Sequence, residues 1–336
     1  MGKKAKDADA VYAGIDIGGT KIYAVVTDAA GKVIGSGRKK TKAELGFEKV
    51  VKRAGKALKK ACEEAGVAQK DLHAVGVGAP SPILPDGTAV AAPNMPGWDH
   101  VPLVPALRDE LGVAVHAEND VNAGALGEHA LGAGRGAETL VGFFMGTGLG
   151  GGIIHRGELL RGVNRMAAEL GHAIVHVGGR RCGCGHDGCL EAYASKTGLG
   201  WRFHHEIVDE GRDSFLVEAC GGDYTNVKSS ILAKGWEAGD AVVREALEEA
   251  CRYLGIGVAN AITTLGPDCV VLGGGVFEAL GDELLPLVEA AAAAHTHPPV
   301  SYRDTRLVLA ELADDAVALG AMVYARECIG ETKGLG

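Results

Sequence analysis

The sequence lacks any apolar run long enough to cross a bilayer, and its start, MGKKAKDADA, has no apolar signal core. It also lacks an excess of positive charge, because 34 Lys and Arg stand against 43 Asp and Glu; the net charge of −9 argues against a general nucleic-acid surface. Aromatic residues make up only 5% of the chain, so its core must be built from Ala, Val, Leu and Ile. We expect a globular cytoplasmic protein without a membrane or nucleic-acid partner.

A length of 336 residues exceeds the usual size of one hydrophobic core and predicts two domains, and 52 glycines predict many tight turns. Five of the eight cysteines lie scattered through apolar patterns, where reduced core residues are the simplest interpretation. These five are Cys62, Cys220, Cys251, Cys269 and Cys328.

The other three cysteines lie in one glycine-rich stretch, residues 169–191, together with a histidine. Thiolates and a neutral imidazole are preferred zinc ligands, and a Cys₃His set is typical of a closed, structural site. One such cysteine alone would be interpreted as a core residue, but three thiols within eight residues favour a metal. His176 and His186 are close enough in sequence to compete for the histidine position. The predicted ligands are His172, Cys182, Cys184 and Cys189.

The first motif of the chain joins two β-branched runs within residues 11–26 through a glycine pair, and a third short strand is expected after them. Backbone N–H groups in such a corner can approach a phosphate that a β-carbon would push away. Asp16, at the end of the first strand, can hold magnesium through water. A plain hairpin turn with a solvent-facing lysine is the alternative. The candidate phosphate loop is Gly18, Gly19, Thr20 and Lys21.

Helical spacing of apolar residues predicts an amphipathic helix over residues 44–65, and a buried strand is expected over residues 72–78. The proline-rich loop that follows can present Asn94 and Trp98 to a small polar ligand, although a turn-forming asparagine is equally ordinary. A strand over residues 113–117 leads into Asn119 and Asp120 at a helix start. N-capping alone would also favour these two residue types there.

A second strand, glycine corner and strand come later: an apolar strand over residues 140–145, then G-T-G-L-G-G-G, then a return strand that begins at Ile153. This layout repeats that of residues 11–26 and indicates an internal duplication. Two like domains would each contribute a glycine corner to one cleft and hold a polyphosphate from both sides. The binding residues of the second corner are Gly146, Thr147, Gly148 and Gly150.

Residues 195–240 carry no motif and are expected to form helices and loops. A long helix is expected over residues 241–265, a buried strand over 269–272 and a helix over 277–294. A final amphipathic helix begins with acidic residues, as helix N-termini prefer. The glycine run after the strand lets a flat or charged ligand touch the backbone, and adenosine is the natural candidate. These glycines are Gly273, Gly274 and Gly275.

Together these motifs resemble those of the ROK-family sugar kinases, closest to the glucokinases of that family, over nearly all of residues 11–328. The family's D-x-G-x-T-K is matched at residues 16–21, its G-T-G-x-G-G-G at residues 146–152 and its E-N-D at residues 118–120, and the C-x-C-x₄-C pattern with its upstream G-H matches the family's zinc site. Ser81 and Ala168 depart from the family, which often carries glycine at both positions. The resemblance implies that Asp120 is the general base. It also implies a set of sugar ligands: Asn94, Asn119, Asp120, Glu169, His172 and Glu191.

The implied fold is the actin-like, ribonuclease-H-like pair of α/β domains with a cleft between them. The expected domains are residues 10–118 with 306–330, and residues 119–305 carrying the zinc loop. The expected activity is ATP-dependent phosphorylation of glucose to glucose 6-phosphate, with structural Zn²⁺, and with Mg²⁺ bound together with ATP.

Several alternatives stay open at this stage. The substrate can be another hexose or an N-acetylhexosamine, such as N-acetylmannosamine or fructose, and polyphosphate can replace ATP as the donor. A sugar-binding regulator without catalysis is a further alternative. Repressors of the family depend on an N-terminal helix-turn-helix, for which the roughly ten residues before the first expected strand leave no room. A homo-oligomer, dimer or tetramer, is also expected.

Overall fold

The computed structural model describes residues 10–92, 95–225 and 227–331. The chain divides into two compact units. Unit 1 runs to Gly136 and also contains residues 158–167 and the chain from Asp314 onward; unit 2 contains Ala137–Gly157 and Ala168–Ala313. The end of the first segment of unit 1 differs from the boundary expected at residue 118. Unit 1 extends past that residue because helix α3 (Asp120–Leu131) packs against helix α10 (Ala316–Cys328) within the same unit.

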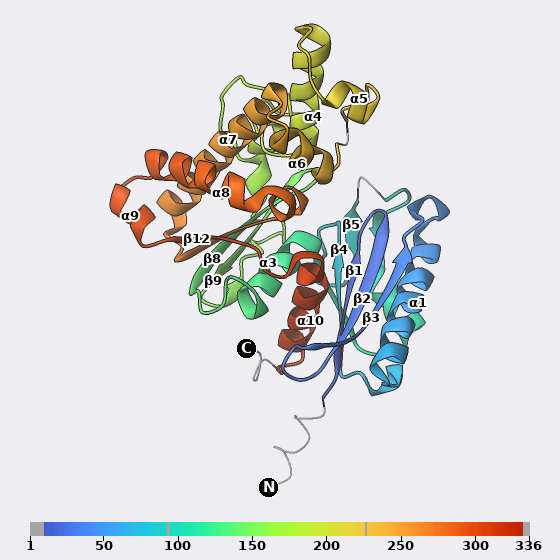
Figure 1. The fold of residues 1–336 in the computed structure, drawn as a ribbon. Helices are drawn as coiled ribbons and strands as arrows, with labels where there is room; N and C mark the ends of the chain where they lie inside the picture. The colour runs from blue at the N-terminus through green and yellow to red at the C-terminus, as the bar shows by residue number, and fades with distance from the viewer. Residues whose placement is uncertain (1–9, 93–94, 226, 332–336) are drawn as a thin grey trace. The chain divides into compact units, whose positions relative to one another are not determined.

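Unit 1 is built on a five-stranded sheet in the order β3-β2-β1-β4-β7 (Figure 1). Strand β1 pairs antiparallel with β2 and parallel with β4, and β4 pairs parallel with β7. The expected run of three strands at the start of the chain is therefore confirmed. The strands are β1 (Tyr12–Ile17), β2 (Lys21–Thr27), β3 (Val33–Lys40), β4 (Val75–Ala79) and β7 (Val115–Asn119).

Helices cover both faces of this sheet. Helices α1 (Phe47–Ala65) and α2 (Leu103–Leu111) bury their apolar sides with Ile15 in one core. On the opposite face α10 approaches the backbone closely, since a Cβ on Gly14 would lie only 1.7 Å from the carbonyl oxygen of Ala318. Because side chains alternate along a strand, Asp16 points to the same face as Gly14. Asp16 therefore lies on the side of the sheet that α3 and α10 cover.

Unit 2 repeats this strand arrangement. Its strands β9-β8-β11-β12 have the order and the directions of β2-β1-β4-β7: β8 is antiparallel to β9 and parallel to β11, and β11 is parallel to β12. The predicted internal duplication is therefore present in the sheet topology. The strands are β8 (Thr139–Met145), β9 (Leu149–His155), β11 (Cys269–Gly273) and β12 (Arg306–Leu309).

One expected boundary in unit 2 is wrong. The return strand begins at Leu149 and not at Ile153, so the second glycine run lies mostly inside β9. Glycines are needed there because the short turn Leu170–His172 lies against the strand: a Cβ on Gly151 would lie 2.6 Å from the Leu170 side chain, and one on Gly171 would lie 2.0 Å from the carbonyl oxygen of Leu149.

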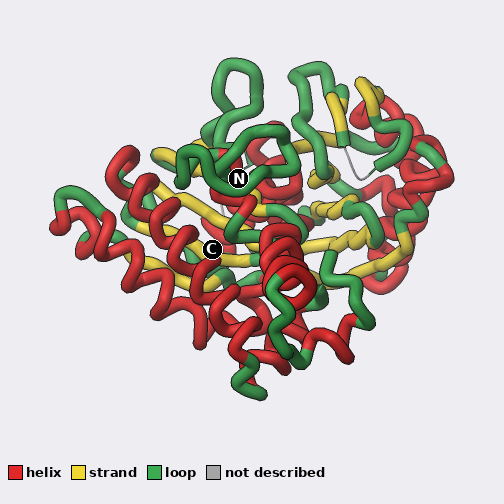
Figure 2. Tube along the Cα trace, turned by 90° about the horizontal axis from the view of Figure 1, so that it is seen from above, coloured by secondary structure: helices red, strands yellow, loops and turns green. Residues whose placement is uncertain are grey.

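The helices of unit 2 fill most of residues 195–295, as expected, and the long helix α7 (Ala241–Leu265) has the predicted bounds. In Figure 2 the red helices lie beside the yellow strands. No helix among the described residues is long and apolar enough to cross a membrane. The other helices are α4 (Lys196–His204), α5 (Leu216–Cys220), α6 (Ser229–Glu237), α8 (Gly275–His295) and α9 (Pro299–Arg303), and the short strands are β5 (Ala89–Ala91), β6 (Asp99–Val101) and β10 (Glu158–Leu159).

Candidate functional site

The first glycine corner, residues 18–21, is the tight turn between β1 and β2. The Gly18 N–H donates to the Lys21 carbonyl at 2.9 Å, and the Thr41 hydroxyl donates to the Gly18 carbonyl at 2.6 Å. Lys21 Nζ lies 3.1 Å from a carboxylate oxygen of Asp314, so this lysine is ion-paired and is not simply solvent-facing. Asp314 lies two residues before the start of the last helix and was not among the residues predicted from the sequence.

Two carboxyl groups face the same region of unit 1. Burial, followed by the charge of the nearby Asp120 carboxylate, raises the pKa of Asp16 to about 7, although Lys21 acts in the opposite direction. Two mutually repelling carboxylates next to a corner of backbone N–H groups form a donor set that suits a hard divalent cation with oxygen ligands. The residues present therefore fit the predicted magnesium.

Asn119 and Asp120 lie where β7 ends and α3 begins, and the N-capping interpretation is confirmed. Asn119 caps the helix, since its Oδ1 accepts from the backbone N–H groups of Val121 at 3.0 Å and Asn122 at 3.1 Å. Its Nδ2 donates to Asp120 Oδ1 at 3.1 Å, and the Val121 N–H donates to the same oxygen at 2.9 Å. The cap thus also holds the Asp120 carboxylate in one orientation.

The loop that was expected to present Asn94 and Trp98 is only partly described, and Asn94 lies outside the described residues. The expectation for Trp98 is wrong. Its side chain is 4% exposed and meets Phe47 of α1 edge-on, with ring centroids 5.5 Å apart. The indole is a core residue because the turn at residues 95–98 folds it inward, with the Trp98 N–H donating to the Met95 carbonyl at 3.0 Å.

In unit 2 the second glycine corner, residues 146–150, joins β8 to β9. The backbone N–H groups of Lys196 and Thr197 donate to the carbonyls of Gly146 and Thr147 at 3.0 and 3.1 Å, which fixes the corner to the start of α4. Glu191 accepts from the Leu149 N–H at 2.9 Å. A Cβ on Gly148 would lie 2.4 Å from an oxygen of the same carboxylate, so a larger residue there would have to displace the Glu191 side chain.

The predicted zinc ligands come together in unit 2. The ligand atoms of His172, Cys182, Cys184 and Cys189 all lie within 4.8 Å of one another, and Cys184 Sγ lies 3.7 Å from Cys189 Sγ. Two sulfurs bound tetrahedrally to one zinc at about 2.3 Å would be about 3.8 Å apart. Hydrogen bonding from the His186 backbone and side chain lowers the pKa of Cys184 to about 6, whereas burial raises the pKa values of Cys182 and Cys189. The donor set therefore fits zinc.

The two competing histidines are placed differently. The ring of His176 lies against two tyrosines, with Nδ1 at 2.9 Å from the Tyr253 hydroxyl and 3.2 Å from the Tyr193 hydroxyl. His186 Nδ1 lies 3.6 Å from Cys184 Sγ, but its ring is not part of the four-residue group. His172 Nδ1 lies 3.8 Å from Cys182 Sγ, so the geometry favours His172 as the fourth ligand.

Of the predicted sugar ligands in unit 2, Glu169 and His172 are exposed and Glu191 is half-buried. Glu191 connects two motifs, because it also lies 3.6 Å from Cys182 Sγ while it accepts from Leu149. The chain reaches Glu169 through Ala168, which has φ +66°. That left-handed backbone explains why glycine suits this position, and alanine is strained there.

The third glycine corner, residues 273–275, carries the chain from β11 into α8. Gly274 has φ +88°, and a Cβ there would lie 2.6 Å from the Met145 carbonyl oxygen. A Cβ on Gly275 would lie 3.3 Å from Ser229 Oγ and 3.6 Å from Lys196 Nζ. Lys196 thus lies at the N terminus of α8. It was missed because residues 195–240 carry no motif, and a lone lysine at a helix start gives no signal.

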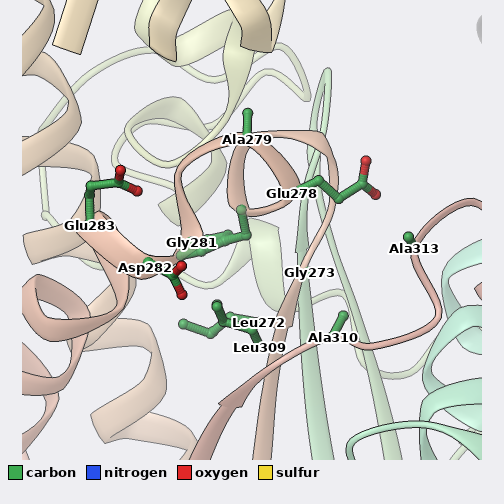
Figure 3. A pocket seen from close by; sticks show the side chains of 11 residues that line it. Leu272, Gly273, Glu278, Ala279, Gly281, Asp282, Glu283, Leu309, Ala310 and Ala313 are labelled. Atoms are coloured by element: carbon green, nitrogen blue, oxygen red, sulfur yellow. The ribbon is translucent and has the colours of Figure 1, made fainter. Parts of the chain in front are cut away.

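A pocket of about 480 Å³ adjoins Gly273 (Figure 3). Its lining includes the apolar residues Leu272 and Leu309 and the acidic residues Glu278, Asp282 and Glu283. Apolar side chains suit an aromatic base, and carboxylates accept hydrogen bonds from amino or hydroxyl groups while they repel phosphates. Other lining residues are Phe277, Gly281, Ala310 and Ala313.

Comparison with known proteins agrees with this set of motifs. A family model described as the ROK family matches residues 12–328. The chain is 35% identical to a glucokinase from Halalkalibacterium halodurans over 93% of this chain and 94% of that protein. It is 34% identical to a glucokinase from Thermotoga maritima over 94% of this chain and 98% of that protein.

Among solved structures, a ROK family glucokinase from Streptomyces griseus in complex with glucose and AMPPNP has a TM-score of 0.80 and 32% identity, covering 95% of this chain and 100% of that one. This similarity confirms the predicted fold class, the actin-like arrangement of two α/β domains.

Proposed function

The chain belongs to the ROK family, and we propose that it transfers the terminal phosphoryl group of ATP to the 6-hydroxyl of glucose. Similarity to glucokinases over more than nine-tenths of the chain supports this substrate. The observation that carries the proposal is Asp120: its carboxylate sits at the start of α3, is oriented by Asn119, and interacts with Asp16 on the same face of the sheet. A kinase needs a carboxylate of this kind to accept the hydroxyl proton.

In the proposed reaction, Asp120 accepts the proton of the sugar hydroxyl. The hydroxyl oxygen bonds to the terminal phosphorus of ATP, the bond between that phosphorus and the bridging oxygen breaks, and ADP leaves. Asp16 would hold magnesium through water, and the ion would neutralise charge on the phosphate oxygens. Lys21 and the N–H groups of residues 19 and 20 would contact those oxygens. No covalent enzyme intermediate is required, since phosphoryl transfer is catalysed mainly by positioning and charge neutralisation.

Unit 2 would supply the remaining contacts to the nucleotide. The backbone of residues 146–150 and the N terminus of α8 are suited to phosphates, and Lys196 adds a positive charge at that helix terminus. We assign the pocket beside Gly273 to adenosine. The acidic residues in its lining would repel polyphosphate, so the uncharged nucleoside part of ATP is the better ligand for this pocket.

Glucose would be bound by amides and carboxylates, which form paired hydrogen bonds with neighbouring hydroxyls. The proposed ligands are Asn94, Asn119, Asp120, Glu169, His172 and Glu191. Zinc would be structural, because four protein ligands leave no open position on the ion. It would act by fixing the loop that carries His172 and Glu191.

A coupled assay of ADP release tests the proposal. Glucose should be phosphorylated with ATP and magnesium more efficiently than N-acetylmannosamine or fructose, and polyphosphate should be the poorer donor. Turnover of another sugar alone would reassign the substrate within the same chemistry. Absence of product from every hexose, with sugar binding intact in calorimetry, would instead favour a non-catalytic sugar-binding protein.

A further inference from the structure

We propose that Arg161 and Glu118 position the catalytic carboxylate: the ion pair between them holds the end of β7 and the start of α3, and with them Asn119 and Asp120, in the orientation that catalysis needs. The proposal rests on the proposed role of Asp120. We call Arg161, Glu118 and Asn122 the brace.

Glu118 is the centre of the brace. It is the residue before Asn119 at the end of β7, and its side chain is 2% exposed. One carboxylate oxygen, Oε1, accepts from the backbone N–H of Asn119 at 3.0 Å and from Asn122 Nδ2 at 3.2 Å. The same carboxylate oxygen is therefore hydrogen-bonded to Asn119, the residue before Asp120, and to Asn122 in the first turn of α3.

Arg161 supplies the charge that lets Glu118 remain buried. Its Nε lies 2.7 Å from the other carboxylate oxygen, Oε2, and its guanidinium group lies over the Tyr324 ring of α10, 4.9 Å from the centroid. A buried carboxylate without a partner is costly and rearranges or takes up a proton. Removing Arg161 should thus release Glu118, and with it the backbone N–H that Glu118 holds.

The hydrogen bonds of the brace continue into the reacting group. Glu118 fixes Asn119, Asn119 caps α3 and donates to Asp120 Oδ1, and Val121 donates to the same oxygen. None of the three brace residues is among the proposed sugar or phosphate ligands. Their effect must pass through the orientation of Asn119 and Asp120. Proton transfer depends on the exact orientation of Asp120, whereas glucose also has ligands outside this pair, so loss of the brace should lower kcat more than it weakens glucose binding.

Arg326 offers a matched control in the same unit. It is a buried arginine, 2% exposed, and its guanidinium group lies over a tyrosine ring as that of Arg161 does, here over Tyr12 at 4.4 Å from the centroid. It donates to the backbone carbonyls of Glu331 and Ala29 at 2.9 and 2.7 Å. Arg326→Met should lower the melting temperature without a specific effect on kcat.

The experiment compares Arg161→Met, Arg161→Lys and Arg326→Met in the full chain, with steady-state kinetics, glucose calorimetry and amide hydrogen exchange. Arg161→Met should lower kcat by about 10–100-fold, change the glucose Kd by less than about fivefold and speed exchange at residues 119–122. Arg161→Lys, which keeps the charge, should recover most of kcat. Arg326→Met should leave kcat and exchange at residues 119–122 unchanged.

The proposal is overturned if Arg161→Met keeps kcat within about twofold of the original protein, or if Arg326→Met loses as much kcat as Arg161→Met does. If Arg161→Met does not fold, Asn122→Ala decides: it removes one donor to Glu118, and unchanged kcat and exchange would refute the brace. If the unaltered protein phosphorylates no hexose, the proposed function fails, while the exchange comparison still tests whether the brace orders residues 119–122.

Discussion

At the residue scale, Asp120 allows the clearest separation of chemistry from binding. In Asp120→Asn the side chain keeps its size and an oxygen that can accept from Asn119 and Val121, but it can no longer take the sugar proton. We expect kcat to fall by roughly 10²–10⁴, with the glucose Kd, measured by calorimetry, changed only a few-fold. Equal losses in binding and turnover would show that Asp120 is only a helix-start residue and a sugar ligand.

Lys196 is the second residue whose role can be isolated. Its Nζ lies near the N terminus of α8, where the proposed nucleotide phosphates would bind. Lys196→Met should raise the KM for ATP by about tenfold and leave the KM for glucose nearly unchanged, because one charge-assisted phosphate contact is lost. The control is Lys234→Met on α6, an exposed lysine of the same unit. A rise in the glucose KM alone would contradict the assignment.

At the scale of elements, sequence periodicity predicted the helices and strands whose bounds depend on the local pattern of apolar residues. The helix over residues 241–265 has the predicted bounds, and the strand at residues 269–273 differs from its prediction by one residue. The start of β9 could not be predicted, because a glycine run in a sequence is typical of a loop. It is compatible with a strand where another segment packs so closely on the strand that side chains would not fit. Here that segment is the turn at residues 170–172.

The residues of the candidate site also divide into those that local sequence patterns predict and those that they do not. The glycine corners, the cysteine spacing and the E-N-D motif are contiguous and were visible in the sequence. Asp314, Lys196 and Arg161 were not, because each acts through a partner distant in the chain: Lys21, the start of α8 and Glu118. Trp98 was misjudged for a related reason, since burial depends on neighbours such as Phe47 that the loop sequence does not contain.

The zinc loop is the element whose removal should have the widest effect. Glu191 lies two residues after Cys189 and contacts both Cys182 Sγ and the Leu149 N–H, so loss of the ion should displace a sugar ligand and loosen the second glycine corner. Cys184→Ser should lower the melting temperature and raise the KM for sugar more than the KM for ATP.

Metal analysis should find about one zinc per chain in the original protein and much less in Cys184→Ser. Cys220→Ser, which changes a cysteine of unit 2 outside the four-residue group, should retain the metal and the kinetic constants. A fully active protein that contains no zinc would refute this account of residues 169–191.

At the scale of the whole molecule, the repeated strand order explains why similar glycine corners occur twice. In each unit, an antiparallel pair of strands meets at a corner, and the first strand of that pair continues the sheet through a parallel neighbour. The duplication was predictable from two matching motifs. The association of the last helix with the first sheet was expected only from the family resemblance, which joined residues 306–330 to residues 10–118, because α10 comes from the opposite end of the chain; it packs on β1 and β4.

The close packing of α10 on the sheet of unit 1 leads to a prediction about stability. A Cβ on Gly76 of β4 would lie 1.7 Å from the Ala321 carbonyl oxygen of α10, a backbone atom that cannot move without shifting the helix. Gly76→Ala should therefore lower the free energy of unfolding by about 1–3 kcal/mol or more. Since Asp314 lies two residues before the start of α10, the shift should also weaken the Lys21–Asp314 pair and reduce kcat/KM for ATP.

Gly55→Ala in α1 is the matched comparison, because its Cβ would meet only the flexible carboxylate of Glu110, with Oε1 at 2.8 Å. Alanine is preferred to glycine within a helix by roughly 0.5–1 kcal/mol, so this variant should be neutral or more stable. Urea unfolding of both variants measures the difference. Equal stability of Gly76→Ala and the original protein would mean that α10 can move away from the sheet, and that its close contact with β1 and β4 does not hold unit 1 together.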